Sequence, residues 1–88
     1  MAIYRDKNTG KKLYPVCSWE KNQHKLYNAH DRLMNAMYEG KVDFDALERV
    51  EKAMSAFDAH VIDGIVYATY EDSLLIKDYV GAYDARHY

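Results

Sequence analysis

The sequence contains few of the residues that cross-link or break up a small fold: one cysteine, one proline and four glycines in 88 residues. A single thiol, Cys17, cannot close a disulfide within the chain, which excludes the disulfide-stabilised class of small secreted domains. Long apolar runs are also absent. No window reaches the roughly 20 apolar residues that a membrane span needs, and the first residues lack the apolar stretch of a signal peptide. We therefore expect a soluble, cytoplasmic protein.

Chain length limits the possible functions as well. A domain of this size buries only roughly 60–65% of the surface that its unfolded chain exposes, so it has one modest core and little room for an enclosed catalytic chamber. With 49% apolar and 30% charged residues, the composition is typical of a folded globular protein. We predict a single domain over residues 1–88.

The N-terminal segment has the pattern of a β-hairpin. Residues 3–5 and 12–14 carry side chains that favour strands, and Asp6 and Gly10 bound a turn-forming stretch between them. The sequence therefore predicts a hairpin over residues 2–15.

Two helices are predicted next, over about 18–39 and 43–62. Ser18 and Asp43 are suitable N-caps, and Gly40 stands where a left-handed residue would end the first helix. Apolar or half-polar side chains recur at helical spacing in both segments: Trp19, Leu26, His30, Leu33 and Met37 in the first, Leu47, Val50, Met54, Phe57 and Val61 in the second. This spacing favours an antiparallel helix pair.

The segment after Gly64 supports two interpretations. Residues 65–70 are rich in β-branched and aromatic side chains, yet a helical period of apolar residues runs through them to Tyr83. We favour a third helix over about 65–84. The predicted fold is then a mainly α, three-helix domain with an N-terminal β-hairpin; the alternative is an α+β fold with a strand at about 65–70.

Charge is distributed unevenly along the chain. Residues 1–41 hold eight Lys and Arg against four Asp and Glu, a net +4, whereas residues 42–88 hold four against ten, a net −6. Cations that could bind an anion, such as a nucleotide or a nucleic acid, lie in the predicted hairpin and on the polar side of the first helix: Lys11, Lys12, Lys21, Lys25 and Arg32. The alternative is that these five cations bind no ligand and only form a solvated, charged surface.

Tyrosine is the most unusual feature of the composition, with nine residues in 88. Tyrosine is enriched at protein interfaces because it offers a large contact area and a polar tip at a small cost in entropy. The candidate contact residues for a protein partner combine two tyrosines with nearby acids: Tyr67, Tyr70, Glu71 and Asp72, together with Asp45 and Glu48 of the second predicted helix. The alternative is that most tyrosines only border a small core.

Catalytic and metal-binding patterns are weak. The spacing of Cys17, His24 and His30 matches no common zinc arrangement, and the serines lack the surroundings of an activated nucleophile. We therefore expect no metal, no cofactor and no enzymatic activity.

In size and composition the chain resembles the stand-alone accessory proteins of phages and mobile elements, which include anti-CRISPR and other anti-defence inhibitors. That resemblance implies a small inhibitor or regulator that binds a host macromolecule in the host cell cytoplasm. The heptad-like spacing of the helices also predicts a homo-oligomer, with a dimer favoured. The alternative function is an oligomeric binder of a nucleotide or nucleic acid through the basic side of the first helix.

Overall fold

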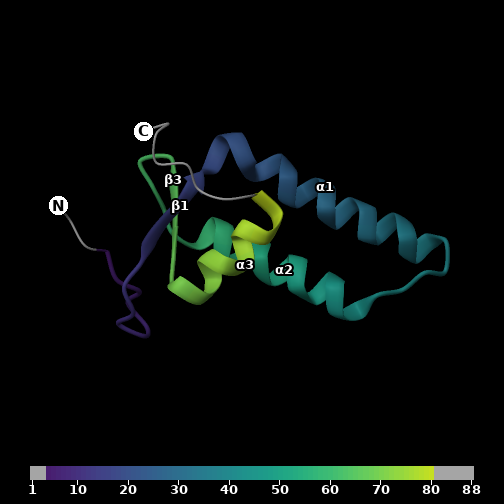
Figure 1. Cartoon of the computed structure of the whole chain (residues 1–88), viewed down its shortest axis with the longest axis horizontal. Coiled ribbons are helices and arrows are strands. Elements are labelled where there is room, and N and C mark those ends of the chain that lie inside the picture. The colour runs from purple at the N-terminus through teal and green to yellow at the C-terminus, as the bar shows by residue number, and fades with distance from the viewer. Residues whose placement is uncertain (1–3, 81–88) are drawn as a thin grey trace.

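The computed structural model describes residues 4–80 and places a small antiparallel sheet at one end of a long helical hairpin (Figure 1). In chain order the elements are β1 (Tyr14–Ser18), α1 (Trp19–Tyr38), α2 (Phe44–Ala59), β2 (Val61–Ile62), β3 (Ile65–Ala68) and α3 (Tyr70–Val80). The three strands lie in the order β1-β3-β2. The mainly helical class is confirmed, and the sheet adds an α+β character.

Local capping interactions define the ends of the helical hairpin. Ser18 Oγ accepts a hydrogen bond from the Lys21 N–H, and Asp43 Oδ1 accepts one from the Ala46 N–H, so both predicted N-caps are present. At the end of α1, Gly40 has a φ of 82°, as the sequence predicts. A glycine reaches this left-handed conformation without the steric cost that other residues meet. The chain therefore reverses between α1 and α2 without strain.

The N-terminal hairpin is shorter than predicted. Arg5 and Lys12 form a single antiparallel bridge, and Gly10, with a φ of 72°, closes the loop between them. The first two residues of the predicted range 2–15 lie outside the described residues. Because one bridge of this kind is weak by itself, the hairpin depends on the packing of its second arm, which continues into β1.

The favoured helix over 65–84 is wrong at its start, because its first residues form strand β3 and α3 begins only at Tyr70. Burial alternates along β3, as a strand with one covered face requires. The alternative interpretation, with a strand at about 65–70, is the one observed. Residues 81–84 of the predicted helix lie outside the described residues.

A tight turn explains this difference. Asp63 and Gly64 have φ values of 52° and 77°, and strands β2 and β3 pair antiparallel on either side of them. Two positive φ values in succession are typical of a type I′ hairpin turn, and an α-helix cannot contain them. The second helix, predicted over 43–62, therefore ends at Ala59. The Asp-Gly pair between β-branched residues was the sequence signal for this hairpin.

The turn allows a test of backbone strain alone, because a Cβ atom added at Gly64 would meet nothing within 4 Å. Replacing Gly64 with Val should lower the free energy of unfolding by about 1–3 kcal/mol, since a β-branched residue strongly disfavours the left-handed region. Gly64→Asn should cost less, because Asn tolerates that region. Urea denaturation of both variants checks this, and equal losses would show that the positive φ is not the cause.

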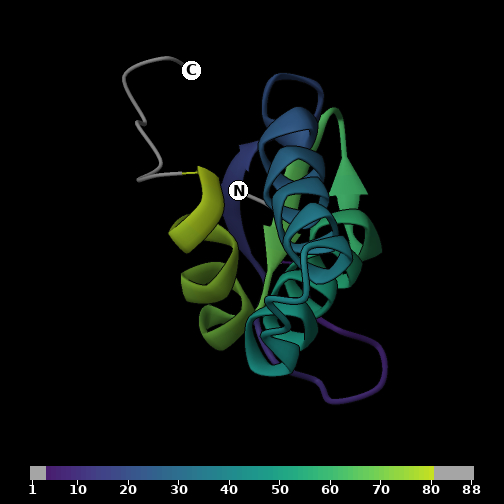
Figure 2. The same ribbon diagram turned by 90° about the vertical axis from the view of Figure 1, so that its right-hand side faces the viewer.

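The core lies where the sheet, the near halves of α1 and α2, and α3 meet. Its most deeply buried large side chains come from five of the six elements: Val16, Leu26, Val50, Val66 and Ile76. Figure 2, which views the hairpin from its free end, shows α3 on one side of the α1–α2 pair. Along the 20 residues of α1 only Leu26 is buried. The free half of the hairpin is therefore covered much less than the half beside the sheet.

Candidate functional site

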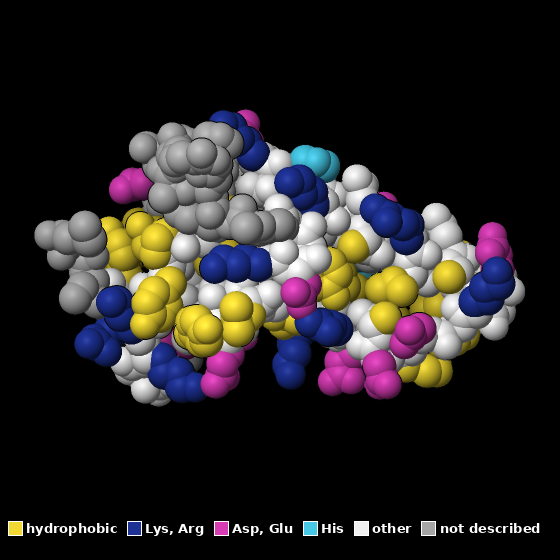
Figure 3. Space-filling model, viewed as in Figure 1, with side chains coloured by type: hydrophobic (Ala, Val, Ile, Leu, Met, Phe, Trp, Pro, Cys, Tyr) yellow, Lys and Arg dark blue, Asp and Glu magenta, His cyan; other side chains and the backbone are white. Residues whose placement is uncertain are grey.

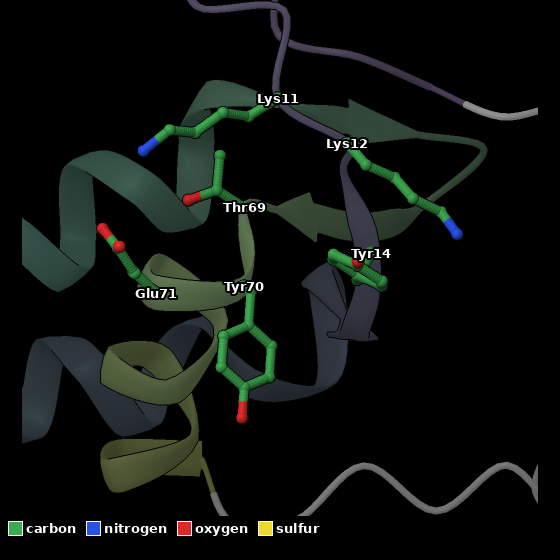
Figure 4. Close-up of a pocket in the computed structure, with 6 residues that line it drawn as sticks. All are labelled: Lys11, Lys12, Tyr14, Thr69, Tyr70 and Glu71. Carbon is green, nitrogen blue, oxygen red and sulfur yellow. The ribbon is translucent and has the colours of Figure 1, made fainter.

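A shallow groove lies where the second arm of the N-terminal hairpin meets the start of α3 (Figure 4). Its volume is about 270 Å³, and its lining side chains come from segments far apart in the sequence: Lys11, Lys12, Tyr14, Thr69, Tyr70 and Glu71. We call it the α3 groove. Tyr70 and Glu71 are candidate contacts for a protein partner, and Lys11 and Lys12 are candidate contacts for an anion. The fold therefore combines tyrosine, acid and lysine in one place.

The first turn of α3 positions one wall of the groove. Thr69 Oγ1 accepts a hydrogen bond from the Asp72 N–H at 3.4 Å, which satisfies one of the free donors at the helix start. Ser73 Oγ donates to the Tyr70 carbonyl oxygen at 2.6 Å, and Ser73 itself is buried. These contacts fix the first turn of α3, with Ser73 on its buried side and Tyr70 and Glu71 exposed to solvent.

Two tyrosine rings form the apolar part of the groove. The Tyr14 and Tyr70 rings lie with their centroids 6.4 Å apart and their planes at 74°, an edge-to-face arrangement. Tyr14 is 39% exposed and Tyr70 64% exposed, and Leu74, one helical turn after Tyr70, is 47% exposed. Figure 3 shows apolar side chains gathered over this region, with charged side chains around them. Together, Tyr14, Tyr70 and Leu74 form an apolar patch.

The charged side chains lie at the edge of this patch. Lys12 Nζ lies 5.1 Å from the centre of the Tyr14 ring, within the range of a cation–π interaction. Lys11 and Glu71 also line the groove, and Glu71 occupies the first turn of α3, where the helix dipole favours a carboxylate. The groove thus has an apolar centre and a polar edge, with both signs of charge available to a ligand.

The other predicted partner residues take different positions. Tyr67 lies outside the α3 groove: its ring packs edge-to-face on Tyr4 at 5.0 Å, and its N–H donates to the His60 carbonyl oxygen. Asp72 is exposed on α3. Asp45 and Glu48 line a second hollow of about 260 Å³ between α2 and α3. Its other lining residues are Arg49, Lys52 and Leu75.

The five cations of the predicted anion site do not meet in one pocket. Lys11 and Lys12 lie by the start of α3, whereas Lys25 Nζ donates to the Val80 carbonyl oxygen at its end. An 11-residue helix is roughly 16 Å long, and that length separates the two groups. Lys21 and Arg32 are exposed on α1.

Chemically reactive groups are few in the part of the chain that the structure describes. Within residues 4–80 no three His, Cys, Asp or Glu side chains gather as a metal site would require. Cys17 is buried in β1. Burial raises the pKa of Tyr79, and the nearby Arg49 charge partly opposes that rise. No helix within residues 4–80 combines the length and the apolar character that a bilayer crossing demands.

Comparison with known proteins identifies no relative. Neither the protein-family models, nor the curated proteins, nor the solved structures contain a match to this chain.

Proposed function

We propose that this protein is a non-enzymatic inhibitor or regulator that binds a partner protein through the α3 groove. The observation that carries the proposal is the contiguous, exposed patch of Tyr14, Tyr70 and Leu74 with charged residues at its edge. Interfaces of this kind place aromatic anchors at the centre and polar groups around them. The resemblance in size and composition to phage-encoded and mobile-element inhibitors agrees with such a role.

The groove suits a protein segment better than a compact metabolite. It is shallow and open, whereas sites for small molecules are enclosed cavities that bury most of the ligand. Tyr70 and Leu74 lie one helical turn apart, so they present two neighbouring anchors along α3. The lysines at the edge attract acidic residues of the partner, and Glu71 provides a charge that selects its orientation.

The test is affinity capture from extract of the organism that encodes the chain, followed by native mass spectrometry and by measurement of the dissociation constant with the purified partner. Tyr70→Ala should weaken binding by about tenfold to a hundredfold, because truncation of a buried aromatic anchor costs about 2 kcal/mol or more. Glu71→Lys should also weaken it.

Tyr70→Phe is the matched control, since it keeps the ring and removes only the hydroxyl group. It should keep most of the affinity, and both variants should unfold at the same urea concentration as the wild type because Tyr70 is 64% exposed. A stoichiometric partner that binds Tyr70→Ala as tightly as the wild type would remove the α3 groove from consideration.

The rival function is binding of a nucleotide or nucleic acid by an oligomer through Lys11, Lys12, Lys21, Lys25 and Arg32. It is supported by the position of Lys12 over the Tyr14 ring in the α3 groove, since phosphate contacts use lysines and base contacts use aromatic rings. It predicts thermal stabilisation by oligonucleotides or nucleotides and a steep loss of affinity with salt. A flat thermal shift across both ligand classes would contradict it.

A further inference from the structure

The side of the α1–α2 hairpin opposite α3 exposes three large aromatic side chains. Tyr27 is 46% exposed, Phe44 70% and Tyr38 84%. Tyr38 ends α1 and Phe44 begins α2, so both lie at the free end of the hairpin, and Tyr27 lies about 16 Å from Tyr38 along α1. We call this side the hairpin face.

Helical geometry places these residues relative to α3. Lys25 donates to the carbonyl oxygen of Val80, and Arg49 pairs with Asp78, so these two contacts mark the sides of α1 and α2 that face α3. At 100° per residue, Tyr27 and Tyr38 lie roughly 140–160° around α1 from Lys25. By the same count, Phe44 lies roughly 140° around α2 from Arg49. The aromatic residues therefore point away from α3.

The two helices also separate their charges by side. The other cations of α1 and α2 lie within roughly 60° of these α3-facing positions: Lys21, Arg32 and Lys52. Four acids lie roughly 120–180° away from the same positions, on the side of the exposed aromatic residues: Glu20, Asp31, Glu51 and Asp58. No Lys or Arg of α1 or α2 lies on the hairpin face. The Lys, Arg, Asp and Glu residues of the two helices therefore give this face a negative charge, and His30 Nε2 lies 3.9 Å from Glu51 Oε1 on the same side.

The free half of the hairpin is incompletely covered. The seam residues beside the sheet, such as Val50 and Phe57, are buried, whereas Leu33, Met37 and Leu47 toward the free end are only half-buried. Figure 1 shows that the sheet and α3 do not reach this end. A further helix packed along the hairpin face would bury the exposed aromatic residues and cover this seam.

We propose that the hairpin face docks a basic amphipathic helix of a partner protein. The partner's apolar stripe packs on Tyr38 and Phe44, and its Lys and Arg residues pair with Glu20, Asp31 and Glu51. The fourth acid, Asp58, accepts a hydrogen bond from Trp19 Nε1 at 2.8 Å within the chain. The 16 residues of α2 make this face about 24 Å long, which matches a partner helix of about four turns. The hairpin face is separate from the α3 groove, so the proposal does not depend on the proposed function.

A second copy of this chain fits the hairpin face poorly. Two hairpin faces in contact would bring eight acids together without a Lys or Arg from either helix pair. The basic side of α1 in a second copy carries Lys21, Lys25 and Arg32 around Asn28, with no large apolar side chain to cover Phe44. The dimer predicted from the sequence stays a prediction.

The probe is a labelled synthetic peptide of 16 residues with a Leu stripe and Lys and Arg on its flanks. A twin peptide has the same stripe and acidic flanks. Fluorescence anisotropy with the full chain should show at least about tenfold tighter binding of the basic peptide, weakening with salt. Phe44→Ala combined with Tyr38→Ala should weaken it by about tenfold or more, and Asp31→Lys with Glu51→Lys should nearly abolish it.

Matched variants on the other surfaces identify the binding site. Lys21→Glu with Arg32→Glu, and separately Tyr70→Ala, should leave the affinity for the basic peptide within about twofold of the wild type. The proposal would be overturned if Tyr70→Ala abolished binding while Phe44→Ala combined with Tyr38→Ala did not. The peptide would then bind in the α3 groove. Equal affinity for the basic and the acidic peptide would also overturn the proposal, because the acids of the hairpin face would then play no part in binding. Concentration-dependent dimers that Phe44→Ala dissolves would assign the hairpin face to a second copy instead.

Discussion

Replacing Phe57 with Ala is expected to lower the free energy of unfolding by about 3–5 kcal/mol. Phe57 is 2% exposed and packs in the core where α2 meets α1 and the sheet. Truncation removes the apolar area that the ring buries and leaves a cavity that its neighbours fill only in part. A domain of this length has a total stability of roughly 4–13 kcal/mol, so the loss removes a large fraction of it.

Phe44 provides a matched control, because the chain contains only two phenylalanines and the other is 70% exposed. Phe44→Ala makes the same chemical change at a solvated position and should alter stability by less than about 0.5 kcal/mol. Urea denaturation, monitored through the single tryptophan Trp19, measures both. Similar losses for the two variants would mean that the free end of the hairpin is buried in solution.

The second large effect concerns the reactivity of Cys17. Burial raises the pKa of the Cys17 thiol from 9.0 to about 11, partly opposed by the Lys25 charge. At pH 8 the thiolate fraction of Cys17 is therefore roughly a hundredfold lower in the folded chain than in the unfolded chain. The higher pKa also makes the folded-state thiolate roughly tenfold more nucleophilic, which offsets part of this difference. The net result is a native thiol that reacts at least about tenfold more slowly than an unfolded one, before steric shielding of a side chain that is 6% exposed.

Labelling with an aromatic disulfide reagent at pH 8, with and without urea, measures this difference. A Cys17→Ala chain that carries Ser55→Cys is the control, since Ser55 is exposed on α2 and its replacement should react at the same rate under both conditions. If native Cys17 reacted as fast as the control thiol, β1 would be open to solvent.

The same pKa shift makes stability depend on pH. Because the folded pKa lies above the unfolded one, the folded chain holds the Cys17 proton more tightly. The stabilisation is therefore complete below about pH 9 and is lost as pH rises toward 11. Between about pH 9 and 11, the free energy of unfolding should fall less for Cys17→Ala than for the wild type. Parallel curves of unfolding free energy against pH would show that the thiol does not contribute to this pH dependence.

The helical hairpin could be predicted from the sequence because its determinants are local. Ser18 and Asp43 cap their helices through the N–H groups three residues later, and Gly40 takes the left-handed conformation that only glycine adopts readily. The 3.6-residue period of apolar side chains was equally readable over α1 and α2. Each of these signals acts within a few residues, so no tertiary contact was needed to interpret them.

Strand β3 was decided by tertiary contacts. Its side chains fit a helical period as well as a strand, but the Asp63-Gly64 turn and the pairing of β3 with both β1 and β2 satisfy its backbone groups only as a strand. The partner strand β1 lies some 50 residues away in the chain and is invisible to local propensity, which is why the segment's own pattern was ambiguous.

For the two candidate surfaces, too, some features could be predicted from the sequence and others only from the tertiary structure. The sequence by itself determined which residues were unusual, above all its tyrosines and the separation of Lys21, Lys25 and Arg32 from the apolar side of the first helix. Only the tertiary structure decided that Tyr70 shares a groove with Lys11 and Lys12, and that Tyr67 does not belong to it. Helical periodicity indicates which side of a helix is polar, but the position of α3 decides which side remains open, because packing between distant segments sets it.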